Sequence, residues 1–313
     1  MICLICQQPK LNILTKQLRD GTSRRVFHCP SCQLGILEEK KINVKQYYTE
    51  DYRKNHSNNL EKPNSKPEGI FRTEKNFQGD RLRIIKRFFS KKKTFLEVGC
   101  SAGQFISQVK DRFKMCAGVE LDTHCARYVQ KKFGLEVKTD PLENCDFQEK
   151  KFDYIAAFQT LEHIQNPLQF LAKAKDLLSP SGKVFIEVPN LHDALLSLWP
   201  ADAYRKFYFH DAHTFYFSPK SLKKLCQKAG FKIDKMYFLQ DYNFFNHFFW
   251  YFNNAPQSNS SFGLSQPQIN FSGFSPKASR EINQLIQDAD QKYKDILSHH
   301  RITSNIFIVA SKA

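Results

Sequence analysis

The sequence contains no long apolar run and no apolar leader. No stretch approaches the roughly 18 uninterrupted apolar residues that a membrane-spanning helix needs, and Met1 to Lys10 has neither the basic start nor the apolar core of a signal peptide. Hydrophobic residues nevertheless make up 41% of the 313 residues, and 29 residues are Phe, so the chain has enough apolar material for a core and is not disordered. We therefore expect a cytoplasmic protein with two folded units, since domains commonly have roughly 100 to 200 residues.

Acidic residues are scarce, above all near the N-terminus. The chain has 47 Lys and Arg against 31 Asp and Glu, which gives a formal net charge of +16. Residues 1–93 alone hold 21 basic and 9 acidic residues, so +12 of the charge lies there. Such a skew is typical of proteins that attract phosphates on nucleic acid, on a nucleotide-activated sugar or on an anionic membrane. A Lys-rich surface kept for solubility explains the skew equally well.

Four of the nine cysteines form a spaced pattern. A disulfide framework is not expected, because the cytoplasm keeps thiols reduced. Cys3 and Cys6 form one C-x-x-C pair, Cys29 and Cys32 form another, and 22 residues separate the two pairs. Each pair brings two sulfurs to one tight turn, and two such turns supply the tetrahedral thiolate set that Zn²⁺ prefers. The spacing predicts a structural zinc site, because four thiolates leave no open position for a catalytic water.

The segment between the two cysteine pairs has the pattern of a hairpin. Asp20-Gly21 is a favoured turn, and it separates strand-like segments at 11–18 and 23–28. Residues 1–45 are therefore predicted to form a small zinc-ribbon module. A redox C-x-x-C is the alternative, but that motif normally stands alone at the start of a helix.

The rest of the chain is predicted to be a linker followed by one large domain. Residues 46–79 are assigned to the linker, because Asn55 to Gly79 is rich in Asn, Ser, Pro and Lys. Asp80 is expected to cap a basic amphipathic helix. From there, apolar runs alternate with helical patterns, which predicts an α/β fold with a doubly wound, Rossmann-like parallel sheet in a domain spanning 80–313. The seven strands are expected at 94–98, 115–120, 135–138, 152–158, 183–188, 231–239 and 305–311, with helices at 102–113, 123–133, 167–178, 218–229 and 277–296.

The first turn of this domain is glycine-rich. Leu96 to Gly103 reads Leu-Glu-Val-Gly-Cys-Ser-Ala-Gly, and its glycines permit a sharp turn and a close approach of a ligand to the backbone. Glu120 stands 21 positions after Gly99, at the end of the second strand, where a carboxylate can bind both hydroxyls of a ribose. A dinucleotide dehydrogenase would show similar features, but Ser101 stands where a pyrophosphate requires the middle glycine.

These two features resemble the first motifs of the class I S-adenosylmethionine (SAM)-dependent methyltransferases. Phe152 to Ile155, followed by Leu161 to Pro167, is similar to the fourth strand of many of them with its following Leu-Glu-His, short turn and Pro. The resemblance implies SAM as cofactor and a Rossmann-like fold.

The resemblance extends to a subgroup with an N-terminal zinc ribbon. The ribbon together with Tyr47, Tyr48 and Tyr52 is similar to the leader of members that methylate sugars and other small acceptors in bacterial glycan and secondary metabolism. Members that methylate carbon carry His-Glu-His where this chain has Asp211-Ala212-His213. The missing glutamate argues against carbon as the acceptor atom, so the resemblance favours O-methylation.

The resemblance also implies a cofactor site residue by residue. Glu97 would hold the methionine ammonium group, Glu120 would bind the ribose, and Leu121 would pack on the adenine. Asp140 would meet the adenine amino group, and Gln159 would offer backbone contacts near the sulfonium. The loop around the methionine part would consist of Gly99, Cys100, Ser101 and Gly103.

Methyl transfer from a sulfonium needs an acceptor aimed at the methyl group, and often a base that takes its proton. Histidine suits this role because its proton exchanges near neutral pH. The candidate catalytic residues are His213, His163, His210 and Asp211. For each histidine, packing or surface exposure without a catalytic role is the ordinary alternative.

An insertion at about 241–303 separates the last two strands. Its aromatic segment, Phe244 to Phe252, would form a lid over an acceptor pocket, a patch in contact with a membrane surface, or part of the core.

We expect methylation of a sugar, a nucleotide-linked sugar or a similar glycan-pathway acceptor, most readily at oxygen. The main alternative is RNA methylation, with the basic ribbon region bound to the phosphate backbone. No Asn-Pro-Pro-Tyr amine motif follows the fourth strand, where Gln159 to Glu162 stands instead. A third reading, a degenerate domain that only mediates zinc-dependent interactions, conflicts with the intact glycine loop and ribose acid.

Overall fold

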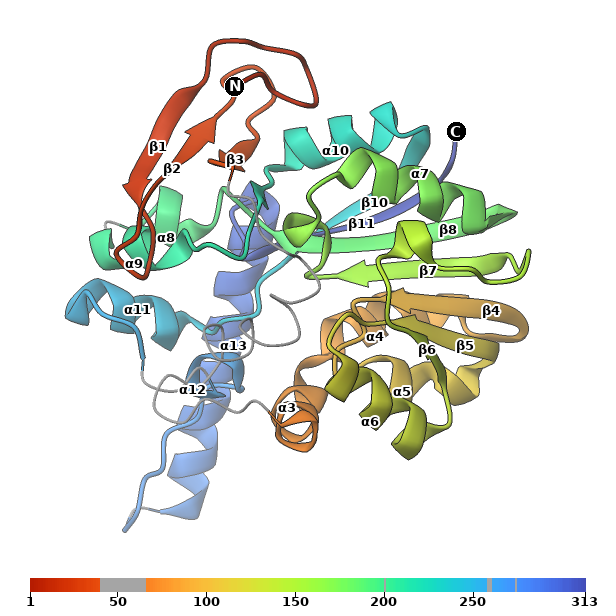
Figure 1. Ribbon diagram of the computed structural model, residues 1–313. Coiled ribbons are helices and arrows are strands. Elements are labelled where there is room, and N and C mark those ends of the chain that lie inside the picture. Colours follow the sequence, from red (N-terminus) through yellow and green to blue (C-terminus); the bar gives the residue numbers. More distant parts are fainter. Residues whose placement is uncertain (40–65, 200, 258–260, 274) are drawn as a thin grey trace.

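The computed structural model describes residues 1–39, 66–199, 201–257, 261–273 and 275–313, and these residues form two sheets (Figure 1). The strands of the larger sheet are β4 (Ser90–Val98), β5 (Phe113–Val119), β6 (Glu136–Lys138), β7 (Phe152–Phe158), β8 (Leu178–Pro189), β10 (Phe231–Leu239) and β11 (Asn305–Lys312). Their order is β10-β11-β8-β7-β4-β5-β6. The pairs among β4 to β8 are parallel, whereas β11 runs antiparallel to both β8 and β10. The prediction of seven strands is confirmed, but the prediction of a wholly parallel sheet is wrong.

Helices cover both faces of the larger sheet, as a doubly wound fold requires (Figure 1). The apolar residues of each helix recur at helical spacing and face the strands. In the helix over 123–133, for example, Cys125, Ala126 and Val129 are buried. One face carries α4 (Gly79–Ile85), α5 (Ile106–Val109) and α6 (Thr123–Phe133), and the other carries α7 (Pro167–Leu177) and α10 (Pro219–Lys228).

A helix lies within the predicted linker. Helix α3 (Pro67–Glu74) begins with a proline, which fits the first position of a helix because its missing N–H would have no partner there. Its Phe71 ring lies 5.2 Å from the ring of Phe133, so α3 packs beside α6. The linker prediction is therefore wrong for 67–74, and its part over 46–65 lies outside the described residues.

Two details of the neighbouring helices also differ from the prediction. The N-cap of α4 is Gln78, and Asp80 lies in the first turn instead. The helix predicted at 102–113 is shorter: α5 begins only at Ile106, a 3-10 turn over Lys110–Arg112 follows it, and β5 begins at Phe113.

The smaller sheet joins the two predicted units. Its strands are β1 (Asn12–Gln17), β2 (Ser23–His28), β3 (Gly35–Leu37) and β9 (Phe215–Tyr216), in the order β1-β2-β3-β9. The first three belong to the ribbon, with the predicted turn at Asp20-Gly21, but β9 comes from the larger domain. Ribbon residues Leu34 and Ile36 share a core with Leu222 and Leu225 of α10. The ribbon is thus fixed to the large domain through a shared sheet and a shared core.

In its described residues, the insertion before β11 forms three helices, α11 (Phe244–Asn253), α12 (Ser261–Leu264) and α13 (Pro276–His300). Helix α11 is buried on one side only, since Trp250 is 4% exposed and Phe252 is 75% exposed. His247 Nδ1 lies 2.6 Å from the hydroxyl of Tyr293, which ties α11 to α13. Figure 1 shows α13 extending away from the larger sheet. None of the helices in the described ranges is long and apolar enough to cross a membrane.

The close pairing of β3 with β9 makes Gly35 sensitive to substitution. A Cβ atom at Gly35 would lie 2.8 Å from Cβ of Tyr216, which is closer than real Cβ atoms approach. We expect Gly35→Ala to lower the free energy of unfolding by about 1–3 kcal/mol, as overpacking does, and to speed amide exchange in β3. The matched control is Gly79→Ala, where an added Cβ meets nothing within 4 Å. Equal unfolding free energies for Gly35→Ala and the wild type would contradict this account.

Candidate active site

A cavity of about 790 Å³ opens at the carboxyl ends of the parallel strands. Residues that end or follow β4, β5, β7 and β8 line it, among them Val98, Val119, Phe158 and Pro189. Strands β4 and β7 start crossovers in opposite directions, so this is the switch point where ligands bind in open α/β sheets. The volume lies in the upper part of the range of small-molecule sites, roughly 300 to 1,000 Å³.

The glycine-rich loop forms one wall of the cavity. Gly99 has φ +76°, and a Cβ there would lie 2.3 Å from Oγ1 of Thr160. Only glycine satisfies both the backbone conformation and this close contact. Ser101 also has a positive φ, 48°, and its N–H donates a 2.7 Å hydrogen bond to Oε2 of Glu120. The turn therefore holds the loop against the end of the neighbouring strand.

Glu97 lies at the end of β4 and lines the cavity although it is only 4% exposed. Its Oε2 has no hydrogen-bond partner among the described residues. Burial raises the pKa of Glu97 to about 8, although the charge of Arg81 acts in the opposite direction. A buried carboxyl with an unused oxygen is a ready partner for a cationic ligand group.

Glu120 is held in place by two backbone amides. Besides the bond from Ser101, its Oε1 accepts a 2.9 Å hydrogen bond from the N–H of Asp122. A carboxylate offers about four lone pairs, so each of its oxygens can accept more than one hydrogen bond. Glu120 lines the cavity beside Leu121, so a diol could bind there.

The structure brings six of the nine predicted cofactor residues to the cavity and places three elsewhere. Cys100 is buried, and its Sγ lies only 2.8 Å from the position that a Cβ atom at Gly118 would take. Asp140 is exposed and does not line the cavity, nor does Gly103. The six residues that line the cavity are Glu97, Gly99, Ser101, Glu120, Leu121 and Gln159.

A network of polar side chains, missed at the sequence level, crosses the floor of the cavity. Arg81 of α4 makes a two-pronged ion pair with Glu187 of β8, at 2.6 and 2.9 Å. The amide of Gln159 donates to Glu187 and to Asn305, at 3.1 and 2.9 Å. Asn305 in turn donates to Asp241, whose pKa is raised to about 7 by burial and by the charge of Glu187. The signal for this network in the sequence was Glu187, because an acid inside an apolar strand requires a buried partner.

Three histidines gather in the lining of the cavity. The ring centroids of His163 and His213 lie 4.8 Å apart, and those of His210 and His213 lie 3.9 Å apart. All three line the cavity, whereas Asp211 does not. Tyr216 is buried and bonds to the backbone of His210, so it supports this loop rather than the cavity wall.

Glu162 lies between two of these rings and was not predicted to belong to the site. Its Oε1 is 3.9 Å from Nε2 of His163 and 4.0 Å from Nε2 of His213. Burial raises the pKa of Glu162 to about 8. Nδ1 of His163 must carry a proton, because it lies 2.9 Å from the carbonyl oxygen of Ala212, which can only accept. One carboxyl and two imidazoles so close together suit proton transfer or a divalent cation.

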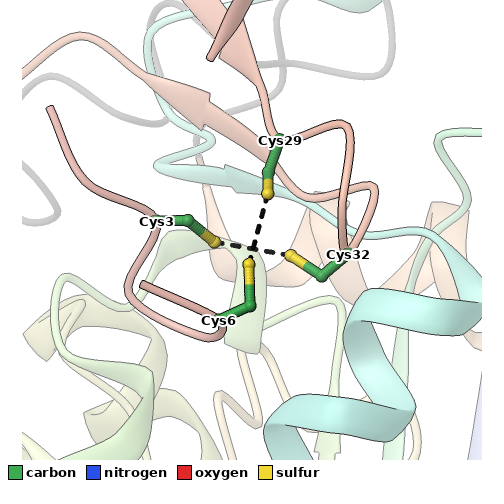
Figure 2. A group of neighbouring side chains, drawn as sticks. All are labelled: Cys3, Cys6, Cys29 and Cys32. Carbon is green, nitrogen blue, oxygen red and sulfur yellow. Dashed lines mark hydrogen bonds between the residues drawn. The ribbon is translucent and has the colours of Figure 1, made fainter. Parts of the chain in front are cut away.

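The four predicted zinc ligands converge on one point in the ribbon (Figure 2). Sγ of Cys3 lies 3.4 Å from that of Cys32, and Sγ of Cys6 lies 3.4 Å from that of Cys29. A tetrahedron with sulfurs about 2.3 Å from its centre has edges of about 3.8 Å, so the arrangement fits a zinc ion.

Comparison with known proteins gives the cavity a chemical context. A family model described as "Methyltransferase domain" matches residues 72–236, just over half of the chain. The ubiquinone biosynthesis O-methyltransferase of Actinobacillus pleuropneumoniae is 26% identical over 158 residues, which cover 46% of this chain and 68% of that protein. The protein of the same name from Nitrosococcus oceani is 27% identical over 187 residues, covering 54% and 76% respectively.

Solved structures agree on the fold. A SAM-dependent methyltransferase from Archaeoglobus fulgidus superposes with a TM-score of 0.50 at 21% identity, covering 78% of this chain and 97% of that one. A chain from the structure described as a complex between the Haloferax volcanii Trm112 methyltransferase activator and the putative methyltransferase superposes with a TM-score of 0.53 at 10% identity. The match covers 88% of this chain and 99% of that one. The fold and the family model together show that this chain belongs to the methyltransferase domain family and is a class I SAM-dependent methyltransferase.

Proposed function

We propose that this enzyme transfers the methyl group of SAM to an oxygen atom of a small acceptor, with a sugar or nucleotide-linked sugar as the first candidate. The observation that carries the proposal is that two groups of residues line one cavity. The glycine loop with Glu97 and Glu120 is the group that we call the cofactor side, and the imidazoles of His163, His210 and His213 are the group that we call the acceptor side. A cofactor on the first side would face an acceptor on the second.

The residues on the cofactor side fit SAM. The unpartnered oxygen of Glu97 is available for the methionine ammonium group, and the carboxylate of Glu120, oriented by two backbone amides, would accept hydrogen bonds from the ribose hydroxyls. Leu121 would pack on the adenine, and Gln159, at φ 49°, would present its backbone near the sulfonium. When bound, SAM supplies an electrophilic methyl group on a positively charged sulfur.

The residues on the acceptor side would position a hydroxyl and remove its proton. His213 is the proposed base, because it lies between His163 and His210 and its Nε2 faces Glu162. His163 is held in one tautomer by Ala212 and would orient its neighbour. The curated relatives named as O-methyltransferases support oxygen as the acceptor atom.

RNA is the alternative acceptor, supported by the basic N-terminal region. Backbone-driven binding of RNA would fall steeply with salt, by a log–log slope of about −0.7 per phosphate neutralised on single strands. A small acceptor, by contrast, is enclosed by the cavity and needs few phosphate contacts.

The acceptor side yields a test of the base. We expect His213→Ala to lower kcat at least about 100-fold, within the range for loss of a general base, while its affinity for S-adenosylhomocysteine (SAH) stays within about threefold. His124→Ala, an exposed histidine on α6, is the matched control and should keep full activity. Radiolabelled SAM with activated sugars, and separately with total RNA, would measure turnover. Unchanged kcat in His213→Ala contradicts the base, and methylation of RNA contradicts the acceptor class.

The cofactor side yields a pH test. Because the pKa of Glu97 is about 8 without ligand, this carboxyl is mostly protonated at pH 7 and must lose its proton to pair with an ammonium group. SAH binding at pH 7 should therefore release close to one proton, and affinity should rise between pH 6 and 8 by up to about tenfold per unit. Calorimetry in buffers of different ionisation enthalpy measures the release. The proton release should vanish in Glu97→Gln and persist in the control Glu281→Gln on α13. Proton release that survives in Glu97→Gln would refute the role of Glu97 in binding the ammonium group.

We further propose that the four cysteines hold one structural Zn²⁺, as in the ribbon subgroup that the chain resembles. Metal analysis of the purified protein should give one zinc per chain, and Cys29→Ser should lose it and unfold the ribbon. Cys145→Ser, whose thiol lies outside the cluster, should retain the metal. A Cys3–Cys6 disulfide in freshly purified, metal-free protein would rule out this site.

A further inference from the structure

One residue of the ribbon reaches the cavity of the large domain. Arg19 follows β1 at the end of the hairpin and lines the cavity beside Tyr204, Phe207 and His210. Its backbone N–H donates a 2.8 Å hydrogen bond to the carbonyl oxygen of Phe209. The ribbon therefore contributes a cationic side chain to a site that the SAM-binding domain otherwise forms.

The side chain of Arg19 is held in one orientation. Its Nε donates to the carbonyl oxygen of Phe207, and the guanidinium carbon lies 3.7 Å from the centroid of the Phe207 ring. Stacking on the ring fixes the plane of the guanidinium, and the Nε bond fixes its rotation. The two terminal nitrogens make no hydrogen bond or ion pair with any residue that the structure describes.

This lack of an ion pair sets Arg19 apart from the other described arginine that lines the cavity. Arg81 also lines the cavity, but the carboxylate of Glu187 neutralises it. Arg25, on the same ribbon, pairs with Glu38. A guanidinium keeps its charge at any physiological pH, so Arg19 presents to the cavity a positive charge that no ion pair neutralises.

The acids near Arg19 offset this charge only in part, since Asp211 acts on it electrostatically but forms no ion pair with it. Asp193 caps α8 (Ala194–Ser197), and its carboxylate is occupied by the N–H of Leu195 and the hydroxyl of Tyr204. Burial raises the pKa of Asp193 to about 7, which reduces its negative charge. The hydroxyl-bearing rings of Tyr204 and Tyr242 line the same side and offer neutral hydrogen bonds.

We propose that Arg19 binds an anionic group of the methyl acceptor, a phosphate or a carboxylate, so that the substrate is a small anion held between the ribbon and the large domain. This inference rests on the proposed methyl transfer and narrows its acceptor. The two terminal nitrogens match the oxygens of a phosphate or carboxylate, which planar guanidinium groups bind in two-pronged fashion. The diphosphate of a nucleotide-linked sugar and the carboxylate of an acidic sugar are the two sources of such a group.

The test uses the full chain saturated with SAH and four probes, inorganic pyrophosphate, uridine diphosphate, malonate and neutral uridine. At least one anionic probe should bind in calorimetry with a stoichiometry of one. Any binding of uridine should be the same with and without the Arg19 guanidinium. Arg19→Gln should weaken the anionic probe at least about tenfold, the usual scale for a lost charge-assisted pair. Arg19→Lys, which keeps the charge but not the two terminal guanidinium nitrogens, should weaken binding of the anionic probe less. Lys16→Gln, an exposed cation on β1 outside the cavity, is the matched control and should change nothing.

SAH affinity in each variant separates the possible failures. Equal binding of pyrophosphate, uridine diphosphate or malonate by Arg19→Gln and the wild type would overturn the inference. So would the absence of binding by every anionic probe in a chain that binds SAH. A chain that does not bind SAH at all would instead overturn the proposed function. Preference for pyrophosphate over malonate identifies a phosphate as the recognised group, and the reverse identifies a carboxylate.

Discussion

The architecture of the site depends on a pairing only two residues long, between β3 of the ribbon and β9 of the large domain. Strand β9 directly follows the loop that carries His210 and His213, so the ribbon fixes one end of that loop. Three further contacts hold it: the Tyr216 hydroxyl bonds to the backbone of His210, the Ala212 carbonyl accepts from His163, and the Phe209 carbonyl accepts from Arg19. The ribbon is thus part of the support of the proposed catalytic side chains.

Buried carboxyl groups dominate the electrostatics of the cavity. Glu97, Glu162 and Asp241 all have raised pKa values, and in each case burial is the largest cause. Removing charged groups from water is costly, so these carboxyls favour their neutral forms until a cationic partner arrives. Arg81 is already the cationic partner of another buried carboxylate, that of Glu187. Glu97 faces the side where a ligand ammonium group would provide the missing charge, which links cofactor binding to proton release.

The sequence predicted well those features that depend on nearby residues. The strands, the glycine turn at Gly99 and the four-cysteine cluster follow from local patterns of hydrophobicity, backbone conformation and spacing. Helix α3 was missed because its eight residues include only two large apolar side chains, Ile70 and Phe71, in a stretch rich in Lys, Asn, Ser and Pro. The approach of His163 to His213, 50 positions apart, and of Arg19 to Phe207 arises from tertiary packing, for which the sequence has no local signal. Asp140 is exposed outside the cavity although β6 ends at Lys138, where the sequence predicted, because the course of the chain after a strand is set by tertiary packing.

The ribbon's position has a consequence for how the enzyme would respond to metal depletion. Cys29 and Leu34 are linked by a backbone hydrogen bond, and Leu34 directly precedes the strand that pairs with β9. Loss of the metal would loosen β3, and with it the histidine loop and Arg19, while the glycine loop and Glu120 lie on separate strands. Chelation of the proposed zinc would therefore abolish turnover as it does in a metalloenzyme, although that ion would contact no reactant. Inhibition by a chelator would in this protein report the integrity of a scaffold rather than the chemistry of an ion.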